Sequence, residues 1–228
     1  MLPSGLTHLS FGQKFCHSID MGVLPSGLTH LVFGNGSYQP IRTGILPHGL
    51  IYLRFGDLFD NPIGIGVLPC SLTQLTFGFE FNHPIDTDVL PKSLTHLTFG
   101  FKFNRPIGRH VLPHGLTHLT FGELFNQPID DIGILPDTVT HLTFDDEFNQ
   151  PIDIDVLPCS LTHLIFGFQF NQPIDVGVLP TGLTHLTFGF QFNQPMGDGV
   201  LPAGLRRLEV GNNFNQPVVV SDKTELIM

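Results

Sequence analysis

The stretch LPKSLTHLTFGFKFNRPI, residues 90–107, recurs with few changes along the chain as far as about residue 218. Its Leu-Pro pair opens a new copy every 22 residues, apart from one step of 23 residues. The ten pairs begin at Leu2, Leu24, Leu46, Leu68, Leu90, Leu112, Leu135, Leu157, Leu179 and Leu201. A fixed period of this length is typical of solenoids, in which neighbouring copies stack and bury a shared core.

Each copy contains the pattern of one short strand. The segment Leu94–Phe99 matches the L-x-x-L-x-L spacing that forms one strand per copy in leucine-rich repeats. Because side chains alternate along a strand, we expect Leu97 and Phe99 to face the core and His96 and Thr98 to face solvent. Stacked strands of this kind form a parallel sheet on the concave face of the coil.

The 19 prolines occupy two positions of the repeat, the Leu-Pro pair and the position before the isoleucine. Proline fixes φ and lacks an N–H group, so the return leg, such as residues 104–113, should be extended. The sequence therefore predicts an all-β, leucine-rich-repeat-like, right-handed solenoid of ten 22-residue repeats, with one parallel sheet on the concave face and a non-helical convex side. The predicted boundaries are 1–218 for a single solenoid domain and 219–228 for a C-terminal tail.

An asparagine follows the second inward phenylalanine in seven successive copies. A buried amide at each turn can donate to and accept from neighbouring turns, which satisfies peptide groups that a non-helical coil leaves unpaired. We therefore expect an asparagine ladder. The first three copies depart from it, with Cys16, Tyr38 and Asp60 at this position. The ladder comprises Asn82, Asn104, Asn126, Asn149, Asn171, Asn193 and Asn215.

Composition and charge exclude several classes of protein. Hydrophobic residues make up 41% of the chain and charged residues 13%, which favours a folded core. A net charge of −10 with ten scattered Lys and Arg residues leaves no basic stripe, so we expect neither nucleic acid nor a membrane as a partner. The first residues do not resemble a signal peptide, and Cys16, Cys70 and Cys159 lie far apart, which favours a reducing compartment and a cytoplasmic location.

No catalytic centre or cofactor site is expected. An enzyme holds a nucleophile and a base, or a metal ion, in a pocket. Copied positions on a rod-like coil provide neither arrangement in recognisable form. The sequence therefore predicts a non-enzymatic protein without a cofactor.

The phrase Phe-Asn-Gln-Pro-Ile occurs whole at residues 125–129, 148–152 and 170–174. It resembles the FNIP repeat, and the resemblance covers essentially the whole chain. That family is a relative of leucine-rich repeats in social amoebae and in giant viruses of amoebae, often behind an F-box domain. The resemblance implies a solenoid that binds other proteins, among them ubiquitin-ligase substrates or subunits, and, for a viral protein, the host cytoplasm. It implies no catalytic residue, because the motif residues build the coil.

A histidine column is predicted along the solvent-facing side of the strands. Neighbouring imidazoles about 5 Å apart could share a metal ion, but the adjacent column offers threonine in place of a carboxylate or a thiolate, so no metal ligand is assigned. The alternative interpretation is a half-exposed ladder whose rings stack and hydrogen-bond to threonine, and which weakens as the pH falls. The column comprises His8, His30, His96, His118, His141, His163 and His185.

Positions that vary between copies are the best candidates for binding a partner, because the coil does not dictate them. Tyr52, Arg54 and Gln74 replace the usual His and Thr in adjacent copies. They bring an aromatic ring, a guanidinium group and an amide close together on the concave face. We predict that these three residues form a contact patch for a partner.

Two phenylalanine pairs are further candidates. Phe79 with Phe101, and Phe168 with Phe190, occupy a position that is polar in the other copies, so we expect them at the surface. Neighbouring exposed aromatic rings favour docking of a partner. The alternative is that the two rings of each pair simply pack against each other.

These observations favour a protein–protein interaction scaffold or substrate-recognition module. The alternatives are a metal- or pH-responsive histidine-ladder binding protein and a self-assembling structural protein. Arg206, Arg207 and Glu209 resemble a C-terminal cap, whereas no comparable cap precedes Leu2. Self-association through the N-terminal edge is therefore a further expectation.

Overall fold

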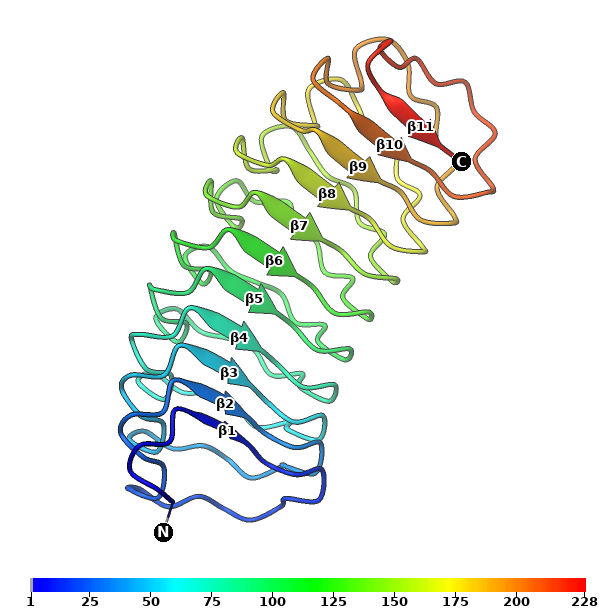
Figure 1. Cartoon of the computed structure of the whole chain (residues 1–228). Helices are drawn as coiled ribbons and strands as arrows, with labels where there is room; N and C mark the ends of the chain where they lie inside the picture. Colours follow the sequence, from blue (N-terminus) through cyan, green and yellow to red (C-terminus); the bar gives the residue numbers. More distant parts are fainter. Residues whose placement is uncertain (1) are drawn as a thin grey trace. The chain divides into compact units, whose positions relative to one another are not determined.

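The computed structural model describes residues 2–228, so residue 1, at which the predicted solenoid begins, lies outside the described part. The chain forms two compact units, one ending at Leu116 and one running from Thr117 to Met228. In each unit the backbone winds as a coil with one short strand per turn (Figure 1). The 22-residue period of the sequence is thus the length of one turn.

Strands of the same unit pair in parallel, in chain order and in repeat register, so that Leu31 lies opposite Leu53 and Leu142 opposite Leu164. The strands of the first unit are β1 (His8–Ser10), β2 (His30–Val32), β3 (Tyr52–Arg54), β4 (Gln74–Thr76) and β5 (His96–Thr98). Those of the second unit are β6 (His118–Thr120), β7 (His141–Thr143), β8 (His163–Ile165), β9 (His185–Thr187), β10 (Arg207–Glu209) and β11 (Glu225–Ile227). Residues 2–228 contain no helix. The predicted all-β, leucine-rich-repeat-like solenoid is confirmed.

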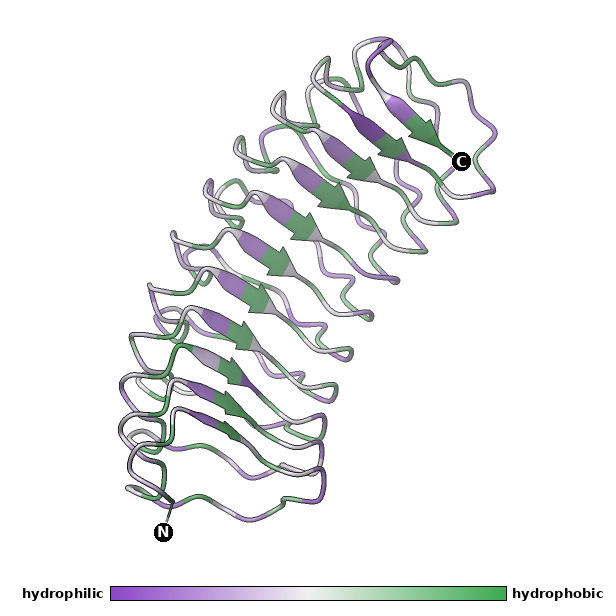
Figure 2. Ribbon diagram, viewed as in Figure 1, coloured by the Kyte–Doolittle hydropathy of each residue, from purple (hydrophilic) through white to green (hydrophobic). Residues whose placement is uncertain are grey.

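Each strand is shorter than the six-residue pattern that predicts it. The N–H group of Leu94 donates to the carbonyl of Pro91 at 3.0 Å, within its own turn, instead of pairing with a neighbouring strand. Residues 91–94 therefore form a turn before β5 begins at His96. The expected alternation within the strand is confirmed, since Leu97 is buried and His96 and Thr98 are half-buried on the other side. Figure 2 shows the hydrophilic start and the apolar centre of each strand.

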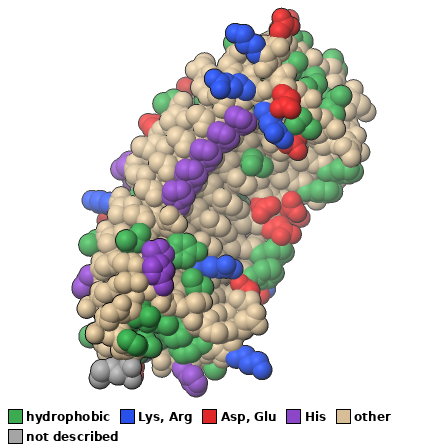
Figure 3. All heavy atoms as spheres, viewed as in Figure 1, with side chains coloured by type: hydrophobic (Ala, Val, Ile, Leu, Met, Phe, Trp, Pro, Cys, Tyr) green, Lys and Arg blue, Asp and Glu red, His purple; other side chains and the backbone are tan. Residues whose placement is uncertain are grey.

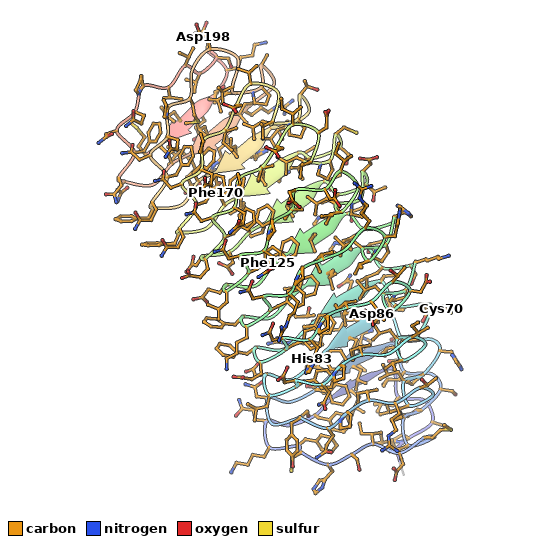
Figure 4. All side chains as sticks on the ribbon, turned by 180° about the vertical axis from the view of Figure 1, so that it is seen from behind. Cys70, His83, Asp86, Phe125, Phe170 and Asp198 are labelled. Carbon is orange, nitrogen blue, oxygen red and sulfur yellow. The ribbon has the colours of Figure 1, made fainter. Side chains whose placement is uncertain are left out.

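Phenylalanine rings fill the interior of each coil. Phe166 and Phe170 stack within one turn, with ring centroids 3.9 Å apart, and Phe166 stacks on Phe188 of the next turn at 5.5 Å. Phe125 and Phe170, labelled in Figure 4, are 1% and 0% exposed. Stacked aromatic pairs add stabilisation beyond the area that they bury. The abundance of phenylalanine therefore reflects two core positions that recur in nearly every turn.

The predicted asparagine ladder is present. The backbone N–H of Asn171 donates to Oδ1 of Asn149 at 2.9 Å, and that of Asn193 donates to Oδ1 of Asn171 at 2.9 Å. Buried amides were predicted, but the ladder residues from Asn82 to Asn193 are half-buried and Asn215 is exposed, because the turns that they connect lie at the surface of the coil. Asp60, which departs from the motif, performs the same role: its Oδ1 accepts from the N–H of Asn82 at 3.1 Å.

The last ten residues differ from the predicted tail. Within residues 219–228, β11 pairs in parallel with β10, and Leu226 lies opposite Leu208. The sheet of the second unit therefore ends at β11, and Arg207 and Glu209 lie on the strand before it. The sequence gives little sign of this strand, because the segment lacks the Leu-Pro pair. Among the described residues, no helix has the length and hydropathy needed to cross a membrane.

Candidate functional site

The outward-facing histidines of the second unit form a stacked row along β6 to β9 (Figure 3). His118, His141, His163 and His185 have successive ring centroids 4.2 Å apart and ring planes within 11° of parallel. In the first unit, His8 stacks on His30 at 4.1 Å. The predicted stacking is therefore confirmed in both units.

Each histidine of the row is held by the threonine that precedes its strand. Oγ1 of Thr140 lies 2.9 Å from Nδ1 of His141 and also donates to the carbonyl of Thr117 at 3.2 Å. Thr162 binds His163 and the carbonyl of Thr140 in the same way. A hydroxyl group has one proton, so the Oγ1 that donates to a carbonyl accepts from the Nδ1–H group. This assignment makes Nε2 the unprotonated nitrogen of His141, His163 and His185.

His163 resists protonation. Desolvation by burial, followed by the charge of neighbouring His185, lowers the pKa of His163 from 6.5. Arg207 lies opposite His185 in the β9–β10 register and adds a permanent positive charge at the end of the row. A neutral His163 ring stacks face to face on its neighbours without charge repulsion.

The geometry of the row does not suit a shared metal ion. Lone pairs of stacked, parallel imidazoles lie in the ring planes, so those of neighbouring rings run side by side and do not converge on one point. Zinc needs three or four ligands arranged around it. Within residues 2–228, no group of three or more His, Cys, Asp or Glu side chains is placed to hold a metal ion.

The structure brings Tyr52, Arg54 and Gln74 together on one face of the first unit. Tyr52 and Arg54 are the two ends of β3, and Tyr52 lies directly opposite Gln74 of β4. Arg54 and Gln74 are exposed, while the Tyr52 ring is half-buried with its centroid 5.8 Å from that of His30. We call these three residues the Tyr52 patch; its role in partner binding stays a prediction.

The two phenylalanine pairs lie where the chain leaves the strands. The rings of Phe79 and Phe101 have centroids 4.3 Å apart, and those of Phe168 and Phe190 have centroids 5.2 Å apart. Phe79, Phe168 and Phe190 are each 41% exposed, and Phe101 is half-buried. The rings of each pair therefore pack on each other and still present apolar area to solvent.

Carboxylates gather beside the second pair, a cluster that the repeat pattern does not predict. Desolvation, then the charges of Asp146, Asp145 and Glu147, raises the pKa of Glu123. Desolvation and the charge of Asp146 raise the pKa of Asp145. The sequence signal was available in the run Asp145-Asp146-Glu147, in a region without lysine or arginine.

A model of the family described as "FNIP Repeat" matches residues 1–36, 39–80, 81–124, 125–169, 148–191, 170–202 and 192–221. The chain belongs to the FNIP repeat family. In this FNIP chain the residues of the motif are structural, since Phe170 and Ile174 are buried and Asn171 supports the next turn. The Tyr52 patch, the histidine row and the phenylalanine pairs all lie outside the Phe-Asn-x-Pro-Ile motif.

The FNIP chain is similar to a solved structure, described as the crystal structure of CroV588, a novel circular LRR protein from a giant virus. The two share 44% sequence identity and superpose with a TM-score of 0.90 over 99% of this chain. The match covers 37% of that chain, so this FNIP chain spans little more than a third of the length of CroV588. No curated protein matches this FNIP chain.

Proposed function

We propose that this FNIP chain is a non-catalytic scaffold that binds another protein through the Tyr52 patch. The observation that carries the proposal is the break in the His/Thr pattern at β3 and β4. Tyr52, Arg54 and Gln74 project away from the core, so coil stability does not require these residue types. Tyrosine and arginine are also the residues in which binding energy at protein interfaces is concentrated.

The threonine–histidine pairs support a structural and not a catalytic role. A nucleophilic hydroxyl passes its proton to the neighbouring base. The hydroxyl of Thr162, however, already donates to the carbonyl of Thr140 at 3.0 Å. The same arrangement recurs at Thr140 and Thr184, as expected for a device that joins consecutive turns.

Affinity purification of the tagged, full-length chain from amoebal lysate, followed by mass spectrometry, tests the proposal. We expect a discrete partner that is lost with Tyr52→Ala/Arg54→Ala and retained with the matched variant His96→Ala/Thr98→Ala, which truncates the equivalent positions of β5. Retention of the partner by the first variant, or equal loss from both, would contradict the role of the Tyr52 patch. Circular dichroism of each variant shows that the coil is intact.

The stacked row favours a second candidate, a binding surface that responds to pH. The four stacked rings are half-exposed, and protonation would convert each Nε2 acceptor into a donor that carries positive charge. A partner that donates hydrogen bonds to the row would be released on acidification. Under this candidate, replacing the row with glutamine abolishes the pH dependence of binding.

A further inference from the structure

The charged side chains of the second unit are mostly acidic. Its segment 117–205 contains eleven acidic residues and no lysine or arginine, so the charge there is −11 with histidine neutral. The first unit, through residue 116, contains six acidic and seven basic residues. The acidic character of the chain is therefore confined to one unit, where the repulsion between carboxylates has few internal cations to offset it.

Four of these carboxylates share the loops that follow β6 and β7. The N–H group of Glu147 donates to the carbonyl of Glu123 at 2.9 Å, which places the two loops on consecutive turns. Asp145 and Asp146 precede Glu147 directly. The raised pKa of Glu123 reflects desolvation and the mutual repulsion in this group. A cation brought by a partner would relieve that repulsion.

The exposed phenylalanine pair, Phe168 and Phe190, lies on the two turns that follow these carboxylates. The N–H group of Gln169 donates to the carbonyl of Asp146 at 2.8 Å, and that of Gln191 donates to the carbonyl of Phe168 at 2.9 Å. Asp146, Phe168 and Phe190 therefore occupy equivalent positions on three successive turns. The Phe168 ring stacks on Phe190 with planes 9° from parallel, so its opposite face is directed toward the turn of Asp146.

We propose that this ledge, formed by Glu123, Asp145, Asp146, Glu147, Phe168 and Phe190, binds an extended, arginine-rich segment of a partner protein. The inference rests on the proposed scaffold function and names a partner chemistry for a surface separate from the Tyr52 patch. Charge complementarity selects a basic partner. The aromatic pair selects arginine over lysine, because a guanidinium group stacks on an aromatic face while it pairs with a carboxylate through two hydrogen bonds.

The dimensions of the ledge set the length of the segment. Three steps of about 4.8 Å separate the turn of Glu123 from the turn of Phe190, which gives roughly 14 Å along the coil. An extended chain covers that distance in about four or five residues. The side of Phe190 away from Phe168 adjoins an open pocket of about 270 Å³, lined by Glu209, Val210 and Gly211 among others, which can receive one more side chain.

Fluorescence anisotropy with the full chain tests the proposal. The probe is a labelled peptide of alternating arginine and glycine, and the matched peptide has lysine in place of arginine. We expect the arginine peptide to bind about tenfold more tightly than the lysine peptide, and high salt to weaken binding of both. Phe168→Ala/Phe190→Ala should weaken binding of the arginine peptide about tenfold, and so should Glu123→Gln/Asp146→Asn.

The matched control is Phe79→Ala/Phe101→Ala, which removes a stacked pair from the same repeat position in the first unit. It should leave the affinity for the arginine peptide unchanged. Thermal unfolding of each variant shows that the coil is folded. Equal affinity for the two peptides, an affinity insensitive to the Phe168/Phe190 change, or no binding at low salt would overturn the proposal. If a partner is still captured through Tyr52 and Arg54, only the ledge fails and the scaffold function stands.

Discussion

His141 and His163 stack with their ring centroids 4.2 Å apart and their planes 10° from parallel. The adjacent threonines hold the two Nδ1 atoms at 2.9 Å from a hydroxyl oxygen, so the rings are fixed in register with the strands. Two imidazolium ions at this spacing would repel each other, and the stack is therefore stable only while the rings are neutral.

Acidification should destabilise the second unit through this row. The pKa of His163 is lowered in the folded state by desolvation and then by His185, so below about pH 6.5 the unfolded chain binds more protons than the folded chain. The stabilisation is present above the unfolded pKa and is lost as the pH falls below it. We expect the thermal unfolding midpoint to fall between pH 7 and pH 5.5, by about 2–4 °C for each kcal/mol lost.

The control for this prediction is His141→Gln/His163→Gln/His185→Gln, because Gln74 occupies the same column in the first unit. The variant should unfold at nearly the same temperature across this pH range. An undiminished fall of the midpoint in the variant would assign the pH dependence to other groups. Histidines outside the row, such as His83 beside Asp60 at 3.2 Å, are present in both proteins and therefore cancel in the comparison.

The asparagine ladder should tolerate aspartate and not alanine. Oδ1 of Asn171 accepts from the N–H of Asn193 at 2.9 Å and from Nε2 of Gln194 at 3.1 Å. Asn171→Ala leaves both donors without this acceptor and should lower the free energy of unfolding by about 1–3 kcal/mol. Asn171→Asp keeps an oxygen in place, as Asp60 does for Asn82, and should retain most of the stability. Urea unfolding compares the two; equal losses would show that the acceptor is not what matters.

Removing charge from the ledge should stabilise the protein. The pKa of Glu123 is raised by desolvation and by its acidic neighbours, so in the folded state its ionised form is unfavourable. The sign is opposite to that of the histidine row: folding is favoured at low pH, and this contribution is lost as the pH rises above about 4.5. Glu123→Gln/Asp146→Asn should therefore raise the unfolding midpoint at pH 7 in low salt, and the gain should shrink at pH 4 or in high salt. A gain that is the same under all three conditions would point to a cause other than charge.

Much of the fold follows from the period of the sequence. A repeated Leu-x-x-Leu-x-Phe pattern fixes which side of each strand is buried, so the inward direction of Leu97 and Phe99 and the stacking of the histidines could be predicted. The hydrogen bond between histidine and threonine was predicted as well and is confirmed, but the pattern did not show which threonine takes part. The partner of His141 is Thr140, the residue directly before β7, because strand alternation ends where β7 begins at His141. Strand β11 was missed because its pairing with β10 depends on backbone hydrogen bonds and not on a repeated motif.

Of the candidate surfaces, the phenylalanine pair could be predicted from the sequence and the carboxylate cluster beside it could not. Phe168 and Phe190 stand out because they break a polar column, and each is 41% exposed in the structure. The carboxylates beside them break no pattern individually, since Glu123 and Asp146 are ordinary polar residues of that column. Their significance depends on the desolvation and repulsion that arise once the loops stack.

Two phenylalanines of neighbouring turns differ in burial and should therefore differ in their contribution to stability. Phe170 is fully buried, with its ring centroid 3.9 Å from that of Phe166, whereas Phe190 is 41% exposed. Phe170→Ala opens a cavity in the stack and should lower the free energy of unfolding by about 3–5 kcal/mol. Phe190→Ala removes one partly solvated ring contact and should cost about 1 kcal/mol. Denaturant unfolding of both variants checks this difference, on which the use of Phe190 as a binding probe depends. A cost at Phe190 as large as that at Phe170 would mean that its ring supports the coil and that the pair is not available to a partner.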